Sequence, residues 1–120
     1  MTSQTVSDRP DIPTTGPTDP ADRCARLRAL HVPGAPLVVP NAWDVASARA
    51  IAGTGFPVVG TTSAGVAAVL GYPDHERAPG GQMLAAAARI IRAVDVPVTV
   101  DAEAGYGMAA ASICPPGARS

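Results

Sequence analysis

The sequence has few aromatic residues, few cysteines, no long apolar run and no excess of charge of either sign. Aromatic residues make up 3% of the 120 residues, and the formal net charge is -1. A nearly neutral chain with scattered arginines lacks the charge pattern of proteins that bind nucleic acid or an anionic membrane, so we expect neither partner. No apolar run approaches the roughly 20 residues that cross a bilayer. With 47% hydrophobic residues, the chain has the composition of one modest globular domain.

The two cysteines and the N-terminal segment indicate a cellular compartment. Cys24 and Cys114 lack the spacing of a metal site, and we expect two free thiols in a reducing environment. Residues 1–18 contain three prolines among Ser, Thr and Asp but no apolar core of a secretory signal, so we expect a disordered leader. Together these features predict a cytoplasmic protein.

A first helix is predicted to begin at Asp19 and Pro20. Aspartate is a favourable N-cap, and proline suits the first helical position. The apolar face that follows at helical spacing consists of Cys24, Leu27 and Leu30. The basic residues predicted to face outward are Arg23, Arg26 and Arg28. We expect this helix to end near residue 31.

Three short β-branched runs predict a parallel sheet. They are "APLVVP" at 35–40, "FPVVGTT" at 56–62 and "VPVTVDAE" at 96–103, each with a proline near its start, where a strand does not yet need the missing donor. None of them alternates polar with apolar residues. Each strand is therefore predicted to be buried on both faces, as in a parallel sheet.

Helical patterns separate these runs. Asn41 is predicted to cap a helix over 42–52, with Asp44 in the capping-box position. A second helix over 82–94 has a continuous apolar stripe, formed by Met83, Ala87, Ile90, Ile91 and Val94. The resulting order of one helix followed by β-α-β-α-β predicts an α/β fold with right-handed crossovers. This rhythm stops after residue 107, and residues 108–120 are expected to form an irregular tail.

Ligands of α/β proteins bind beyond the carboxyl ends of the strands, and this chain places unusual residues there. Asp101 and Glu103 follow the third run and, at positions i and i+2 of a strand, would project to the same side. Two carboxylates suit Mg²⁺, which commonly keeps several of its waters. The alternative is that they cap the next helix or pair with an arginine.

The segment "GTTSAGVA" after the second run opens a helix with small residues. Its backbone N–H groups and the helix dipole would favour a carboxylate or phosphate. It lacks the lysine of a P-loop. The alternative is a small-residue turn that permits tight packing. Asp74, in the loop that follows, is on its own expected to be a solvated acid.

In combination, these motifs resemble a known family. "LVVPNAWDVASARAIAGTGFPVVGTTSAGVAAVLGYPD" followed by "VPVTVDAEAGYG" is similar to the N-terminal part of the isocitrate lyase/phosphoenolpyruvate mutase superfamily, closest to its phosphonomutase-like members. The resemblance implies a (β/α)₈ barrel, of which residues 19–107 supply about the first three βα units. It also implies a lyase or mutase that acts on C–C or P–C bonds of small keto or hydroxy carboxylates through an enolpyruvate-like intermediate.

The resemblance also implies roles for individual residues. Asp101 matches the acid that ligates Mg²⁺ (or Mn²⁺), and Glu103 matches its partner, which acts through a metal-bound water. The residues that match the loop holding the substrate carboxylate are Thr62, Ser63, Ala64 and Gly65. The residues that match catalytic positions are Asp74, Trp43 and Asp44.

The sequence departs from the family pattern at several points. Glu103 replaces a more common aspartate, and Thr62 replaces a serine. The family's later metal-shell acids and its "KKCGH"-type loop have no counterpart, which predicts a truncated and inactive chain. The resemblance implies a homo-oligomer for the full-length protein. The alternatives are a non-catalytic α/β fragment and a flavodoxin-like module that binds phosphate or carboxylate.

Overall fold

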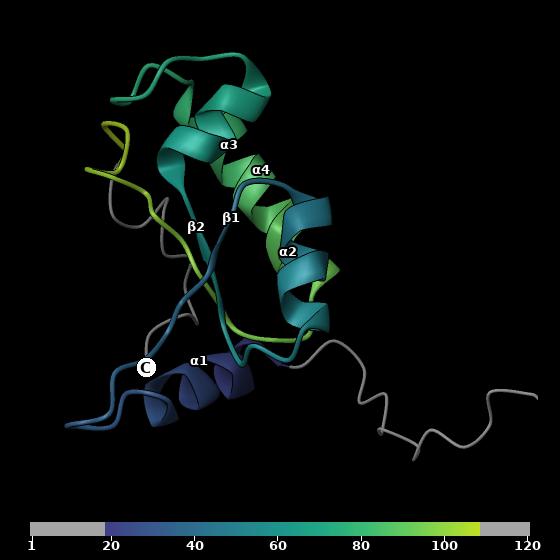
Figure 1. Cartoon of the computed structure of the whole chain (residues 1–120). Helices are drawn as coiled ribbons and strands as arrows, with labels where there is room; N and C mark the ends of the chain where they lie inside the picture. The colour runs from purple at the N-terminus through teal and green to yellow at the C-terminus, as the bar shows by residue number, and fades with distance from the viewer. Residues whose placement is uncertain (1–18, 109–120) are drawn as a thin grey trace, which may run out of the picture.

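A computed structural model describes residues 19–108, and the terminal segments predicted as leader and tail lie outside the described residues, apart from Met108. Helices and strands alternate along the chain except for α3 and α4, which both lie between β2 and β3 (Figure 1). The elements are α1 (Pro20–Ala29), β1 (Asn41–Ala42), α2 (Val45–Gly53), β2 (Val59–Thr61), α3 (Ser63–Leu70), α4 (Gly80–Ala93) and β3 (Val98–Thr99). No helix within 19–108 is long and apolar enough to cross a membrane.

The three strands form one parallel sheet in the order β1-β2-β3. The predicted α/β fold with a parallel sheet is therefore confirmed. Figure 1 shows α2 and α4 side by side on one face of this sheet. The central strand β2 is buried at all three of its residues, whereas Asn41 of β1 and Thr99 of β3 are exposed. Burial on both faces was predicted for every strand and holds only for β2, because each edge strand has a neighbour on one side only.

The first strand begins later than predicted. Residues 36–39 form no ladder, and pairing begins where Pro40 O accepts from Gly60 N–H (2.8 Å). Pro36 and Pro40 have no N–H to donate, so this run cannot form a regular ladder. Asn41 consequently lies in β1 and does not cap the next helix.

Asp44 is the N-cap of α2. Its carboxylate accepts from Ser47 N–H (2.7 Å), and Ser47 Oγ accepts from Asp44 N–H (3.1 Å), which completes a capping box. The prediction that Asn41 caps the helix was wrong by three residues. Both side chains are good N-caps, and strand pairing of Asn41 with Gly60 decides between them.

The core lies between the sheet and its helices. The stripe predicted on α4 is buried at Met83, Ala87 and Ile90, while Ile91 is 36% exposed. Ala48 of α2 is fully buried, and its small side chain allows α2 to approach the sheet closely. The core therefore follows the predicted apolar positions with one exception.

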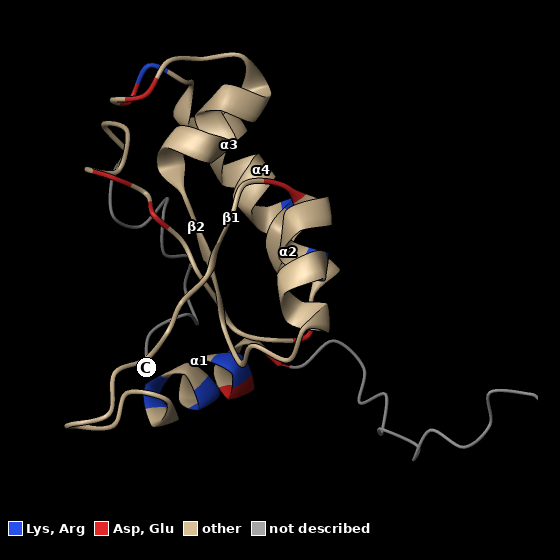
Figure 2. Cartoon of the chain, viewed as in Figure 1, with Lys and Arg blue, Asp and Glu red and all other residues tan. Residues whose placement is uncertain are grey.

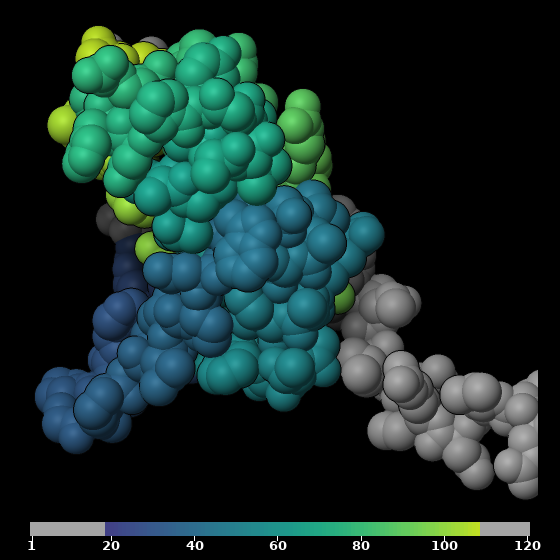
Figure 3. All heavy atoms as spheres, turned by 45° about the horizontal axis from the view of Figure 1, so that its top comes forward, coloured from purple at the N-terminus to yellow at the C-terminus, as the bar shows by residue number. Residues whose placement is uncertain are grey.

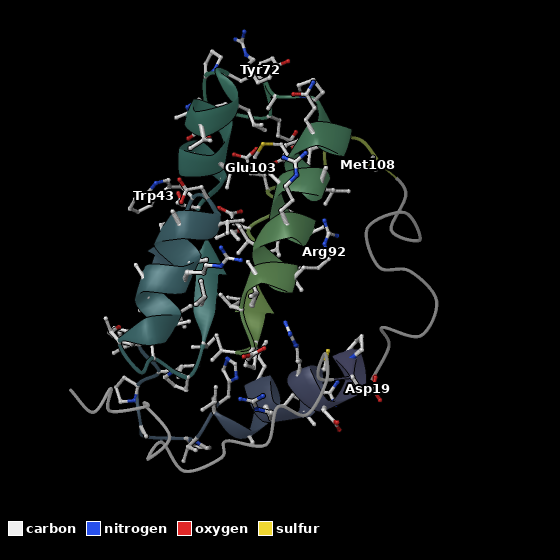
Figure 4. All side chains as sticks on the ribbon, turned by 90° about the vertical axis from the view of Figure 1, so that its right-hand side faces the viewer. Asp19, Trp43, Tyr72, Arg92, Glu103 and Met108 are labelled. Atoms are coloured by element: carbon white, nitrogen blue, oxygen red, sulfur yellow. The ribbon has the colours of Figure 1, made fainter. Side chains whose placement is uncertain are left out.

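Helix α1 attaches through polar contacts. Asp19 caps it as predicted, but none of its residues is buried. Arg23 and Arg26, which were predicted to face outward, instead donate to Ile91 O (2.9 Å) and Asp95 O (3.3 Å). Ile91 O lies in the last turn of α4, whose carbonyls have no intrahelical donor, and Asp95 O lies just after the helix, so the guanidinium groups satisfy acceptors at this helix end. Figure 4 shows α1 beyond this end of α4, across the end of the sheet opposite to α3.

Candidate active site

Three loops meet at the carboxyl end of the sheet. They follow β2, α3 and β3, and in Figure 3 the yellow residues after β3 lie against the green residues after α3. The small closed pocket between them has no space for a water molecule, and the polar side chains that line it belong to Ser63, Asp74, Glu76, Arg77, Glu103 and Tyr106. The structure thus brings together residues from three separate parts of the sequence.

A buried hydroxyl fixes the point where the chain leaves β3. Asp101 N–H donates to Thr61 Oγ1 (3.0 Å), and Thr61 is only 6% exposed at the end of β2. Backbone pairing between β2 and β3 ends at Thr99, so the side chain of Thr61 takes over where the ladder stops. This hydrogen bond places Asp101 beside the first residue of α3.

The Asp101 carboxylate meets the N-terminus of α3. It accepts from Glu103 N–H (3.0 Å), and the hydroxyl and backbone N–H of Ser63 lie close enough to interact with it. These hydrogen bonds, with that from Glu103 first, hold the pKa of Asp101 below its usual range, although burial opposes them. Asp101 is therefore a carboxylate anion at neutral pH.

The two acids do not lie on the strand. β3 ends at Thr99, and Glu103 sits in a turn with a φ of 48°. The prediction that strand geometry projects Asp101 and Glu103 to one side was therefore wrong. They lie in one tight turn, in which the Asp101 carboxylate accepts from the N–H group of Glu103 two residues ahead.

The first turn of α3 combines close packing with backbone donors that have no acceptor within the helix. Thr62 is the N-cap, and its Oγ1 accepts from Gly65 N–H (3.4 Å). The N–H groups of Ser63 and Ala64 have no acceptor within the helix, as in any first turn. A Cβ at Gly65 would lie 2.7 Å from Thr62 Cγ2 and 3.0 Å from Trp43 Cβ. Gly65 thus serves the close packing of this turn, and its own N–H is directed to Thr62.

Asp74 and Glu76 enter the pocket from the loop after α3. Asp74 is half-buried there. Glu76 Oε1 accepts from Ala104 N–H (3.0 Å) and Tyr106 N–H (3.2 Å), so it links this loop to the loop after β3. Sequence reasoning did not identify Glu76, because a lone acid in a loop carries no pattern that distinguishes it.

The pKa of Tyr106 reflects the charges that surround the pocket. Its phenolic oxygen is buried and has no hydrogen-bond partner within residues 19–108. Burial raises the pKa of Tyr106, and so do the negative charges of four carboxylates, which in decreasing order of effect are Glu103, Asp101, Glu76 and Asp74. Figure 2 shows the acidic segments of both loops on the same side of the molecule. The carboxylates of Asp74, Glu76 and Glu103 outnumber the single guanidinium of Arg77 that lines the pocket, so the pocket is negative overall.

Trp43 and Asp44 lie elsewhere. Asp44 is engaged with Ser47, whose backbone and side-chain hydrogen bonds hold the pKa of Asp44 below its usual range. Trp43 is 47% exposed and lines a separate cavity of about 360 Å³ between α2, α3 and α4, with Asp44 beside it. In Figure 4 the side chain of Trp43 points outward at the place where α2 and α3 meet. The structure does not bring this pair into the pocket that contains Asp74 and Glu103.

The donor set of the pocket can be compared with the needs of a metal ion. Among residues 19–108, no group of three or more His, Cys, Asp or Glu side chains could hold a metal ion. Asp101 and Glu103 offer two carboxylates in negative surroundings, and Mg²⁺ commonly takes one or two carboxylates and keeps several waters. These residues fit a hydrated Mg²⁺ and not a cation that requires a complete protein cage.

A family model described as phosphoenolpyruvate phosphomutase matches residues 27–114. The chain belongs to the isocitrate lyase/phosphoenolpyruvate mutase superfamily. The match includes the first residues of the segment 108–120. The resemblance of the strand-end motifs to this superfamily is confirmed.

Individual members of the superfamily are similar in sequence and structure. An uncharacterized protein of Mycobacterium tuberculosis is 48% identical over 77 residues, which are 64% of this chain and 30% of that protein. The 2,3-dimethylmalate lyase of Eubacterium barkeri is 37% identical over 86 residues, 71% of this chain and 30% of the lyase. A solved phosphonomutase-like protein of Burkholderia cenocepacia has a TM-score of 0.69 at 45% identity, over 72% of this chain and 35% of that one. The chain thus spans about a third of the length of its relatives.

Proposed function

We propose that the protein carrying this chain is a Mg²⁺-dependent lyase or mutase. Its substrate would be a small keto or hydroxy carboxylate whose C–C or P–C bond breaks or forms by way of an enolpyruvate-like intermediate. The observation that carries this proposal is the position of Asp101, which joins the end of β3 to the first turn of α3 and lies close to further carboxylates. The 2,3-dimethylmalate lyase among the relatives supports the same class of chemistry.

The residues of the pocket suit complementary tasks. Asp101 and Glu103 would hold the cation, which supplies positive charge to the oxygen that becomes negative as the bond breaks. The N–H group of Ala64 would help to orient the substrate carboxylate at the N-terminus of α3, while Ser63 interacts with Asp101. Asp74 would face the substrate from the opposite loop.

The position of Asp101 favours this proposal over a simple anion-binding module. A phosphate or carboxylate bound to the first turn of α3 would lie near the Asp101 anion, which already interacts with Ser63. Repulsion between the two anions weakens such binding unless a cation lies between them. An anion site that depends on Mg²⁺ is therefore more consistent with the geometry than an independent one.

We further infer that β1, β2 and β3 are neighbouring strands of a (β/α)₈ barrel in the complete protein. Their parallel order and the TM-score of 0.60 to the solved 2,3-dimethylmalate lyase, at 31% identity over 73% of this chain, support this. A cytoplasmic location, a homo-oligomeric state and the absence of nucleic-acid and membrane partners remain predictions from the sequence.

The decisive experiment measures cation binding and its coupling to an anion. Mn²⁺ is titrated into the protein by electron paramagnetic resonance, with and without oxalate, a planar dianion shaped like the enolate of pyruvate. We expect Asp101→Asn to weaken Mn²⁺ at least tenfold, Glu103→Gln to weaken it less, and the surface control Asp22→Asn to leave it unchanged. Oxalate should tighten Mn²⁺ binding in the wild type.

The same protein preparations are assayed for Mg²⁺-dependent release of pyruvate from 2,3-dimethylmalate and related hydroxy acids. Equal Mn²⁺ affinity for the wild type and Asp101→Asn would contradict the metal assignment. Oxalate binding that does not change with the cation would instead support the anion-binding module.

A further inference from the structure

Glu76 has no role in the chemistry proposed above, yet it makes the contacts that join two loops of the pocket. Its Oε1 accepts from the N–H groups of Ala104 and Tyr106, at 3.0 and 3.2 Å. These groups lie 28 and 30 residues further along the chain. One carboxylate oxygen therefore holds the middle of the turn that follows Asp101 and Glu103.

Both loops have unusual backbone conformations. Within residues 19–108, four non-glycine residues have a positive φ: His75 (67°), Glu76 (58°), Glu103 (48°) and Tyr106 (55°). Such conformations cost free energy in residues with a Cβ and persist only where surrounding contacts fix them. All four residues lie in the two loops that Glu76 connects, so its hydrogen bonds are in the right place to hold this strained backbone.

The turn after β3 is also pressed against the start of α4. A Cβ at Gly80 would lie 2.7 Å from Tyr106 Cβ, so the absence of a side chain at Gly80 allows this contact. The packing restrains the ring of Tyr106 on one side. It provides no acceptor for the N–H groups of Ala104 and Tyr106, which only Glu76 supplies among the described hydrogen bonds.

We propose that Glu76 is a positioning residue that braces the turn 101–107 in the shape in which Asp101 and Glu103 bind the cation. The role of the turn in cation binding rests on the proposed function. The hydrogen bonds by which Glu76 holds the turn exist without a metal and can be tested without one. Because Oε1 is engaged with two backbone donors, Glu76 acts through the turn and is not assigned as a ligand. A neutral side chain with the same oxygen should therefore replace it.

The test compares Glu76→Gln, Glu76→Ala and the surface control Asp95→Ala. Hydrogen exchange of the Ala104 and Tyr106 amides is followed by NMR in the full chain without metal. We expect exchange at both amides to be at least tenfold faster in Glu76→Ala and to change less than threefold in Glu76→Gln, whose amide oxygen can still accept. Thermal melting checks that each variant is folded.

A second readout is the titration of Tyr106, followed by NMR with labelled tyrosine in a Tyr72→Phe background. In Glu76→Ala the released ring should become exposed, so its pKa should fall toward that of a free tyrosine. In Glu76→Gln the pKa should fall less, since only one of four nearby charges is lost. Mn²⁺ affinity should fall at least tenfold in Glu76→Ala and at most threefold in Glu76→Gln.

The outcomes separate the brace from the proposed function. Unchanged amide exchange in Glu76→Ala would overturn the brace, whatever the protein binds. Equal Mn²⁺ losses in the Gln and Ala variants would also overturn it, because they would show that the charge of Glu76 matters and not its hydrogen bonds. If the wild type binds no Mn²⁺, the proposed function fails, while amide exchange still decides whether Glu76 holds the turn.

Discussion

The N-termini of α2 and α3 each meet a carboxylate, but the two acids reach them by different routes. Asp44 precedes α2 directly and bonds to Ser47 within the same turn. Asp101 comes from the end of β3 and meets Ser63 of a different helix. The first contact stabilises one helix, whereas the second joins a helix to a strand. Only the long-range contact brings separate segments of the chain into one site.

The largest loss of stability is expected from a substitution where α3 packs against the segment before α2. Gly65→Val would force side-chain atoms into Thr62 and Trp43, and overpacking of this kind should lower the free energy of unfolding by about 3 kcal/mol. Gly53→Ala is the matched control at the end of α2, because a Cβ there meets nothing within 4 Å. Urea unfolding of both variants measures the difference. Equal stability would show that the first turn of α3 is not tightly packed.

The next effect concerns the hydroxyl that places Asp101. Thr61→Val keeps the shape of this buried side chain but removes the acceptor for Asp101 N–H, which should cost about 1–2 kcal/mol. Thr61→Ser keeps the hydroxyl and should preserve Mn²⁺ affinity, whereas Thr61→Val should weaken it. Calorimetric titration measures the affinity for Mn²⁺, and urea unfolding measures the loss of stability. If Thr61→Val binds Mn²⁺ as the wild type does, Asp101 is positioned by Ser63 and the turn alone.

Loss of the local contact between Asp44 and Ser47 should lower stability by a smaller amount and leave metal binding unchanged. Asp44→Ala removes the capping box of α2 and should cost about 1 kcal/mol. Asp44→Asn should recover most of this loss, because asparagine is also a good N-cap. Neither variant should change Mn²⁺ affinity, since Asp44 lies outside the pocket of Asp74 and Glu103. A loss of metal affinity in Asp44→Ala would show that Asp44 contributes to the active site after all.

The smallest effect is expected in the pH dependence of stability. The pKa values of Asp44 and Asp101 are lowered in the folded protein, so each group stabilises it above the ordinary aspartate pKa near 4, and this contribution is lost as the pH falls through the folded value. Urea unfolding between pH 3 and 6 should show stability rising with pH. Asp101→Asn should flatten the profile, and Asp95→Asn should not. A profile unchanged in Asp101→Asn would mean that its hydrogen bonds do not persist in solution.

Sequence patterns predicted the parts of the fold that depend on local chemistry. Apolar periodicity identified the buried positions of α4, and Asp19 with Pro20 marked the start of α1. The start of β1 was misplaced because the valines of 37–39 favour a strand, while the ladder requires donors that the neighbouring prolines lack. The strand propensity of a residue reflects its side chain. Whether it pairs in a sheet also depends on backbone donors and acceptors, including those of another segment of the chain.

The candidate site was predictable as a set of residues but not as an arrangement. Asp101 and Glu103 were identified from their places after a strand and Asp74 from the family resemblance alone, and the structure brings Asp74 and Glu103 into one pocket. The contact of Asp101 with Ser63 and the turn held by Glu76 depend on how the sheet aligns distant loops. No local pattern encodes such contacts. Their roles in binding and catalysis remain predictions for the experiments above.

The attachment of α1 has a consequence for how the molecule opens. This helix buries none of its residues, and the described side-chain hydrogen bonds that tie it to the rest of the chain are those of Arg23 and Arg26. Directional contacts of this kind break within a small angular displacement and recover little solvent entropy when they form. We therefore expect helix α1 to detach before β2 and α4 unfold, which would expose Ile91 O and Asp95 O to water.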